Sequence, residues 1–403
     1  MKAAMAQPSA PYLRHSLTER VGEFIALRRE IHAHPELAFE EHRTAALVAR
    51  KLADWGYEVA TGLGGTGVVG TLRRGQGARS MGIRADMDAL PIIEATGHAW
   101  ASQTPGVMHA CGHDGHTATL LAAARHIAEH VAFDGTLHLI FQPAEEGAAG
   151  AVRMMEDGLF ERFPCDAIFA LHNMPGAPTG HFTFRSGATM ASSDNVIITL
   201  QGIGGHGAMP HTTADPLVAA SSIVMALQTI VARNVDPLHT AVVTVGALQA
   251  GQANNVIPDQ AVMKLSVRAL DPQVRSLLKD RIHEVVTQQA ASYRVHAHID
   301  WQDGYAVLVN DNACTALATD IAIELFGSER VTPQGAPITA SEDFAFMLQR
   351  VPGCYFFVGN GAAGTPGACM VHNPGYDFND DIIADGAALW SALVPAYLAP
   401  ATT

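Results

Sequence analysis

The sequence has few cysteines and no pair spaced as CxxC. The number is odd and the spacing wide, which argues against a disulfide framework or a zinc ribbon, and free thiols are typical of a reducing cytosol. The N-terminal segment, residues 1–16, lacks the continuous apolar stretch of about 7–15 residues that a secretory signal needs. We therefore expect a cytoplasmic protein that begins with a disordered lead-in. The five cysteines are Cys111, Cys165, Cys314, Cys354 and Cys369.

Charged residues are also scarce, at 16 % of the chain, and acidic ones dominate. Lys and Arg number 25 against 39 Asp and Glu, a formal charge of −14, so no nucleic-acid partner is expected. No run approaches the roughly 20 apolar residues that cross a bilayer, so no membrane partner is expected either. A hydrophobic content of 48 % excludes a disordered chain, and 403 residues suggest two or three domains.

Strands and helices alternate in the first and last parts of the chain, a pattern typical of an α/β layer with a parallel sheet. From about residue 189 the pattern changes to long strands and amphipathic helices. We predict an α/β fold. Residues 1–188 and 306–403 form a domain with a mostly parallel sheet flanked by helices, interrupted at 189–305 by a smaller α+β domain. The expected strands are 67–72, 80–84, 136–141, 167–171, 195–201, 241–248, 261–270 and 295–299. The expected helices are 17–31, 40–55, 117–131, 215–232, one after Asp271-Pro272, 314–326 and 381–397.

Histidine is in excess, with 20 in the chain, and it is concentrated in one segment. His109-Ala-Cys111-Gly-His113-Asp-Gly-His116 holds a thiol, three imidazoles and a carboxylate within eight residues. A single histidine is most often structural, but a mixed set of this density indicates a metal site. Cysteine and histidine together suit Zn, Mn or Co better than Ca or Mg.

Further polar residues follow apolar strands, where open α/β sheets place their sites. Glu145 and Glu146 come directly after the strand predicted at 136–141. There, one carboxylate can bind a metal while the other acts as a base. His172 and His372 are weaker single candidates, and Asp86 or Asp88 can orient a metal-bound imidazole without touching the metal.

Two glycine-rich segments match the nucleotide-binding pattern GxGxxG, at residues 62–67 and 202–207. The first is followed by a strand in place of a helix, and the second is followed by Pro210 before any helix begins. Both therefore fail the structural context that a nucleotide site requires. The second segment is better interpreted as a flexible functional loop that carries His206.

Nine motifs in order resemble the M20 metallopeptidase family, in its aminoacylase, hippurate hydrolase and auxin-conjugate hydrolase branch. The match runs from about residue 32 to residue 381, nearly the whole chain. The motifs are HAHPELAFEE (32–41), IRADMDALPI (83–92), MHACGHDGHTA (108–118), FQPAEEG (141–147), ALHN (170–173), GGHGAMPH (204–211), NVIPD (255–259), ASEDFAFM (340–347) and VHNPGYDF (371–378).

The resemblance implies a metal-dependent amidohydrolase that acts on linear amides, with two divalent metal ions per subunit (Zn, Mn, Co or Ni). It implies a catalytic domain (1–188 and 306–403) and a lid/dimerisation domain (189–305), which makes a homodimer or dimer-based oligomer the expected assembly. Glu145 matches the general base, which would activate a metal-bridging water, and His206 matches a lid histidine that reaches the partner's active site. Asn255 and Arg268 match positions near the substrate carboxylate, although an interdomain salt bridge is an equal reading of Arg268. The matching metal ligands are Cys111, His113, Glu146, His172 and His372.

One departure from the wider family is visible, because Arg84-Ala85-Asp86 stands where other branches have an HxD motif. Cys111 and His113 would substitute for the missing ligand, with Asp86 behind the metal-binding groups. The expected reaction is hydrolysis of N-acyl-amino acids, hippurate-like or N-acetylated, to a carboxylic acid and an amino acid. The alternatives are a dipeptidase or carboxypeptidase of the same fold, a metal-binding sensor without catalysis, and a nucleotide-dependent enzyme.

Overall fold

The computed structural model describes residues 10–399, which form two compact units. The first unit comprises the chain up to Gly187, Asn310–Ala336, and the chain from Phe346 on. The second comprises Ala188–Val309 and Pro337–Ala345. Of the lead-in expected at residues 1–16, residues 1–9 lie outside the described part, and the rest was predicted wrongly because it is helical from Ala10.

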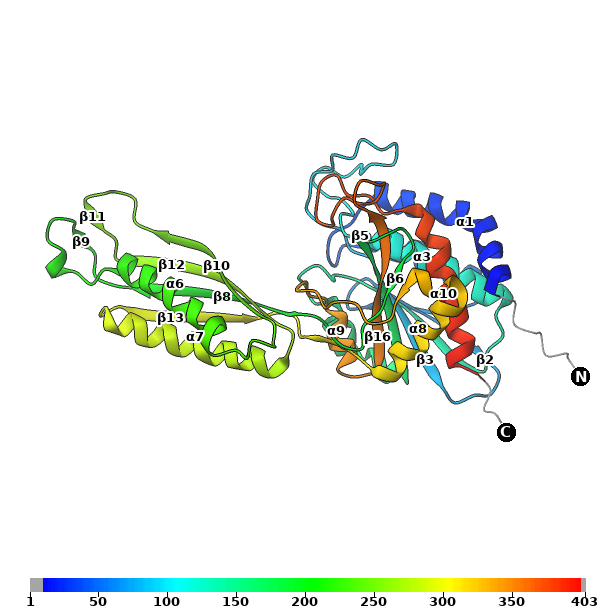
Figure 1. The fold of residues 1–403 in the computed structure, drawn as a ribbon. Helices are drawn as coiled ribbons and strands as arrows, with labels where there is room; N and C mark the ends of the chain where they lie inside the picture. The colour runs from blue at the N-terminus through cyan, green and yellow to red at the C-terminus, as the bar shows by residue number, and fades with distance from the viewer. Residues whose placement is uncertain (1–9, 400–403) are drawn as a thin grey trace, which may run out of the picture. The chain divides into compact units, whose positions relative to one another are not determined.

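The first unit is built on an eight-stranded mixed sheet, drawn on the right of Figure 1. The strand order is β1-β2-β4-β3-β5-β16-β6-β15. The four strands β4, β3, β5 and β16 are mutually parallel, while β1, β2 and β6 pair antiparallel at the sides. The strands are β1 (Glu58–Leu63), β2 (Gly67–Arg74), β3 (Ser80–Asp86), β4 (Gly135–Gln142), β5 (Ala167–Gly176), β6 (Phe182–Thr183), β15 (Val331–Thr332) and β16 (Gly353–Ala362).

The central strands are apolar along their length, which explains their position. Every residue of β3 is buried, as are nine of the ten in β16. Strands covered on both faces read in this way, without polar alternation. Helices cover the sheet, and α1, α3 and α10 pack against one another. The helices are α1 (Ala10–Ala33), α2 (His42–Asp54), α3 (His113–His130), α4 (Gly150–Glu156), α5 (Leu159–Arg162), α8 (Asn312–Phe326), α9 (Phe344–Leu348, across a unit boundary) and α10 (Ile383–Tyr397).

The second unit is a four-stranded antiparallel sheet, in the order β10-β12-β8-β13, with two helices packed on it. Both helices start at an Asp-Pro pair, whose aspartate accepts hydrogen bonds from the free amides of the first turn while proline occupies the first helical position. The main elements are β8 (Ser192–Gln201), β10 (Ala241–Ala250), β12 (Gln260–Ala269), β13 (His296–Asp303), α6 (Pro216–Arg233) and α7 (Pro272–Ser292). Short ladders pair β9 (Gly205–His206) with β11 (Val256–Ile257), and β7 (Gly187–Met190) with β14 (Leu308–Asn310).

The predicted α/β class is confirmed, and most predicted elements are present. Sequence patterns missed β1 and β16, and α3 begins four residues earlier than expected, at His113. No membrane-spanning run was expected, yet α6 is long and apolar enough by length and composition alone. This is weak evidence, because a core helix of a water-soluble protein passes the same test. Three of its apolar side chains, Ala219, Ile223 and Leu227, belong to the core of the second unit.

Candidate metal centre and active site

The polar residues predicted from the motifs converge at the carboxyl ends of the parallel strands in the first unit. Cys111 immediately precedes α3, and His113 is its first residue. Between them, Gly112 adopts a left-handed φ of 95°. A Cβ atom there would lie 2.4 Å from the side chains of Asn173 and Tyr376, so only glycine allows this close approach.

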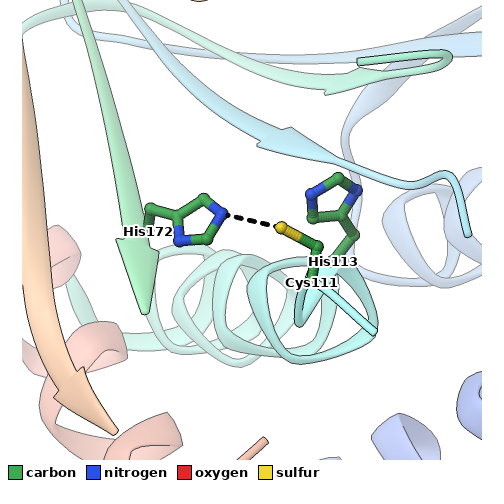
Figure 2. A group of neighbouring side chains, drawn as sticks. All are labelled: Cys111, His113 and His172. Atoms are coloured by element: carbon green, nitrogen blue, oxygen red, sulfur yellow. Dashed lines mark hydrogen bonds between the residues drawn. The ribbon is translucent and has the colours of Figure 1, made fainter. Parts of the chain in front are cut away.

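Three of these side chains form a first group, shown in Figure 2. Cys111 lies between His113 and His172, and its Sγ is 3.3 Å from His172 Nε2. The other ring nitrogen of His172 donates to the Asn173 carbonyl oxygen at 2.6 Å, which leaves the Nε2 lone pair facing the thiol. Burial, together with the neighbouring His116, holds the pKa of His172 well below its usual value. His172 is therefore neutral, the form that binds metals.

A second group shares Cys111 with the first. The ligand atoms of Cys111, Glu146 and His372 lie within 4.8 Å of one another, as do those of the first group. His372 Nε2 is 3.1 Å from Glu146 Oε1. His372 has an unusual left-handed φ of 63°, and its amide donates to the Ala110 carbonyl oxygen at 2.7 Å, so its loop is tied to the cysteine segment.

Glu145 completes the cluster. It is 7 % exposed, and one of its carboxylate oxygens lies within 4.8 Å of the ligand atoms of His113 and Glu146. Both carboxylates come from residues 143–149, the strap between β4 and α4. The sequence-predicted ligands and the predicted base are thus brought together in one place.

The electrostatics of this cluster fit a divalent cation. Burial opposes protonation of His113, but the carboxylates of Asp86 and Asp88 outweigh it and raise its pKa to about 10. Burial and the neighbouring Glu146 raise the pKa of the Cys111 thiol well above its usual range. His113 Nε2 is buried and makes no hydrogen bond. A bound cation would balance the carboxylates, favour the thiolate and occupy that nitrogen.

Asp86 contacts the cluster both directly and through intermediate residues. Its Oδ1 accepts a hydrogen bond from His116 Nδ1 at 2.6 Å, and its Oδ2 pairs with Arg84 at 2.7 Å. His116 Nε2 in turn accepts from the Asn173 amide at 3.1 Å, and Asn173 Nδ2 donates to the Cys111 carbonyl oxygen at 2.7 Å. Asp86 therefore orients the cysteine segment through two intermediates, although its Oδ2 also lies 3.7 Å from His113 Nε2.

Asp88 has the more direct role, and sequence reasoning left it as an alternative to Asp86. Its Oδ1 is 3.2 Å from His113 Nδ1 and accepts from the Glu145 amide at 3.0 Å. Its Oδ2 accepts from the Glu146 amide at 2.9 Å. One buried carboxylate thus holds a candidate ligand together with the backbone of both Glu145 and Glu146. The second aspartate of the RADMD motif was the available signal.

The predicted residues of the second unit lie at two separate places. His206 in β9 pairs with Val256 in β11, directly after Asn255, whose carbonyl oxygen accepts from Gly207 at 2.8 Å. His206 Nδ1 accepts from the Ala208 amide at 3.0 Å, so the ring proton of the neutral form is on Nε2. Arg268 lies near the opposite end of β12, where its Nη1 donates to the Thr339 carbonyl oxygen at 2.8 Å.

The chain is similar to several known proteins. Residues 82–396 match the profile of "Peptidase family M20/M25/M40". The chain is 45 % identical to hippurate hydrolase of Campylobacter jejuni, over 94 % of this chain and 97 % of that protein. It is 39 % identical to N-acetyl-L-cysteine deacetylase of Bacillus subtilis, over 90 % and 85 %. The solved structure of Bacillus subtilis YXEP, described as a dinuclear metal binding peptidase from the M20 family, has a TM-score of 0.82 at 32 % identity, covering 94 % of this chain and 99 % of that one.

Proposed function

The chain belongs to peptidase family M20/M25/M40, and we propose that it hydrolyses N-acyl-amino acids with the help of two divalent metal ions. The amide bond of a small substrate, hippurate-like or N-acetylated, is cut to a carboxylic acid and a free amino acid. The names of the hippurate hydrolase and the N-acetyl-L-cysteine deacetylase support this substrate class. The observation that carries the proposal is the sharing of Cys111 by two groups of candidate ligands beside Glu145.

We assign the two ions to those groups. Cys111, His113 and His172 would hold one ion, and Cys111, Glu146 and His372 the other, with the thiolate common to both. The donor set of sulfur, imidazole and carboxylate suits Zn, Mn, Co or Ni. When bound, such ions polarise the amide carbonyl and lower the pKa of the attacking water.

Glu145 is the proposed general base. It takes the proton of the attacking water and returns it to the nitrogen of the leaving amino acid, so that the proton balance closes within one residue. Its position supports this role, because its side chain is almost fully buried among the candidate ligands and its amide is held by Asp88.

His206 and Arg268 of one chain cannot serve the same substrate molecule. On β8, Ser193 pairs with Arg268 and Gln201 pairs with Gln260, eight residues further along. At about 3.3 Å per residue this is about 26 Å, and β9 with His206 lies beyond that end (Figure 1). An N-acyl-amino acid is far shorter. We therefore propose that His206 stabilises the oxyanion in the active site of a partner copy, with Asn255 beside it, while Arg268 binds the substrate carboxylate.

The second unit offers a surface for that partner copy. Helix α6 exposes apolar side chains on the side away from its sheet, and β10 is an edge strand. Apolar residues of this kind, gathered on one helix, are typical of a protein interface. We propose a homodimer formed through this lid/dimerisation domain. The exposed large apolar residues of α6 are Leu217 (40 %), Val218 (47 %), Met225 (71 %) and Val231 (37 %).

The proposed compartment is the cytoplasm, because all five cysteines are free. The proposed partners are a small-molecule substrate and a second copy of the chain, with neither nucleic acid nor membrane among them.

The reaction is tested by hydrolysis of hippurate, N-acetylmethionine and N-acetylcysteine, alongside dipeptides. We expect cleavage of the acylated substrates that a chelator abolishes and added Zn, Mn, Co or Ni restores. Glu145→Gln is expected to lower turnover by about 10²–10⁴-fold while the metal content is unchanged. Preferential cleavage of dipeptides would favour the dipeptidase or carboxypeptidase alternative. Full turnover by Glu145→Gln would refute the role of Glu145.

The shared active site is tested by mixing inactive variants. His206→Ala and Glu145→Gln carry lesions on different parts of the proposed composite site. After exchange of subunits, a mixed dimer holds one site with both native residues, and activity is expected to recover to a fraction of wild type. If mixing restores nothing although subunits have exchanged, His206 acts within its own chain.

A further inference from the structure

Glu41 is a buried residue whose carboxylate does not stabilise the helix next to it. It stands at the N-terminus of α2, yet its side chain makes no capping bond to that helix. The residue is fully buried. In proteins, a glutamate is almost never fully buried unless its carboxylate is paired. Burial raises the pKa of its carboxyl group. Burying an ionised carboxylate is unfavourable unless it accepts hydrogen bonds. Its hydrogen-bond partners, which lie outside α2, therefore indicate its role.

Those partners are the backbone amides of two turns and the hydroxyl of Thr66. Glu41 Oε1 accepts from the amide of Ala144 at 2.9 Å and from the amide of Phe39 at 3.1 Å, and the Thr66 hydroxyl donates to Oε2. Ala144 lies 103 residues away and immediately precedes Glu145. The carboxylate thus connects the segment before α2 to the strap that carries the proposed base.

Both amides belong to residues in a conformation that only outside contacts maintain. Ala144 has a φ of 54° and Phe39 a φ of 64°, two of the five left-handed non-glycine positions among the described residues. Such a conformation is strained and persists where the surroundings over-determine it. At Ala144 it turns the chain directly before Glu145, so the direction of the base depends on it.

Together with Asp88, Glu41 binds three consecutive amides of the strap. Ala144 donates to Glu41, Glu145 to Asp88 Oδ1 and Glu146 to Asp88 Oδ2. We infer that Glu41 is a positioning residue for catalysis, which holds the left-handed turn at Ala144 so that Glu145 faces the substrate. This inference rests on the proposed role of Glu145 as the general base.

The sequence offers a matched control in the same segment. Glu36 also accepts two backbone amides, from Arg43 at 2.8 Å and Thr44 at 2.9 Å, but both belong to the first turn of α2. Glu36→Ala therefore removes a helix-capping carboxylate without touching the strap. It is expected to lower the melting temperature and leave kcat within about twofold of wild type, because capping affects helix stability alone.

The test compares kcat, KM, metal content and melting temperature across the variants. Glu41→Ala is expected to lower kcat by about 10–100-fold, the usual effect of losing a group that orients another in the site, with KM and metal content near wild type. Glu41→Gln, whose amide oxygen still accepts from Ala144, is expected to restore most of the turnover. In a Glu145→Gln background, Glu41→Ala is expected to add no further loss, since it acts through Glu145.

Two results would overturn the inference: a kcat for Glu41→Ala equal to wild type, or an equal loss with and without Glu145. Should Glu41→Ala fail to fold, Glu41→Gln and Glu41→Asp decide. The inference requires the glutamine variant to be the more active, because aspartate withdraws the acceptor from Ala144, and the reverse order refutes it. If Glu145→Gln is itself fully active, the proposed base is wrong. If it is inactive while Glu41→Ala is active, only the positioning role fails.

Discussion

Replacement of Asp88 tests how the site holds its carboxylates. Asp88 is 1 % exposed, and its two oxygens accept from two strap amides and contact the His113 imidazole. Asparagine has nearly the same shape but a single acceptor oxygen. With that oxygen in the Oδ1 position, the contacts to Glu145 and His113 remain, and the amide NH₂ faces the Glu146 N–H.

The expected loss follows from that geometry. One buried amide donor is left without an acceptor, which costs about 1–3 kcal/mol. Since 1.4 kcal/mol corresponds to a factor of ten, turnover in Asp88→Asn should fall by about 5–150-fold if the whole cost appears in the transition state. Asp88→Ala strands all three donors, and we expect a larger loss that includes reduced metal binding through His113 and Glu146.

The assay is steady-state hydrolysis of hippurate at saturating metal, with metal content and melting temperature measured on the same samples. Asp134 supplies the control. Its Oδ1 accepts from the amides of Gln76 and Gly77, both at 2.7 Å, in a loop beside β2. Asp134→Ala strands both of these donors, so it should lower stability and leave kcat unchanged. A folded Asp88→Ala protein with wild-type turnover and metal content would refute the reasoning.

Three further predictions concern other parts of the molecule. Cys111→Ala should lower the bound metal by more than His172→Ala or His372→Ala, because Cys111 belongs to both ligand groups; equal metal losses measured by elemental analysis would contradict the shared thiolate. Met225→Glu places a charge on the exposed face of α6 and should shift the protein from dimer to monomer in light scattering, and an unchanged mass would exclude that face. Burial opposes protonation of His32, but bonds to Asp114 and Glu94 outweigh it and raise its pKa to about 9. The charged His32 imidazole therefore stabilises the folded state by about 3 kcal/mol, since its pKa is raised from 6.5 to about 9. This contribution is complete below about pH 6.5 and is lost as the pH rises through about 9. Urea unfolding at pH 6.5 and 9.5 should show that loss in wild type and much less in His32→Gln, and parallel pH profiles would count against it.

The candidate ligands could be identified from the sequence because each lies in a short, recognisable string. Cys111 and His113 are separated by one glycine, and the Glu145–Glu146 pair follows an apolar strand. Parallel strands bring their carboxyl ends to one edge of the sheet, so motifs far apart in the chain were expected to meet there. The α/β class followed from the same alternation of strands and helices, and it is confirmed.

The backbone partners of the groups that support these ligands could not be identified in this way. Asp88 reaches the strap across 57 residues and Glu41 across 103. In the sequence, Asp88 and Glu41 are two of 39 acidic residues. No sequence pattern indicates which backbone amides they bind. The left-handed turn at Ala144 is also invisible, because alanine carries no signal for a positive φ.

The sequence by itself determined the family, the fold class and the chemistry of the candidate site, because these depend on local strings and on periodicity. The tertiary structure alone decided which carboxylate holds which backbone, and that His206 and Arg268 lie at opposite ends of the second unit. The physical reason is that hydrogen bonds of about 3 Å depend on three-dimensional distance. Residues one hundred positions apart in the chain can therefore lie within hydrogen-bonding distance. His206 and Arg268, which the sequence assigns to one substrate, lie too far apart to contact the same molecule.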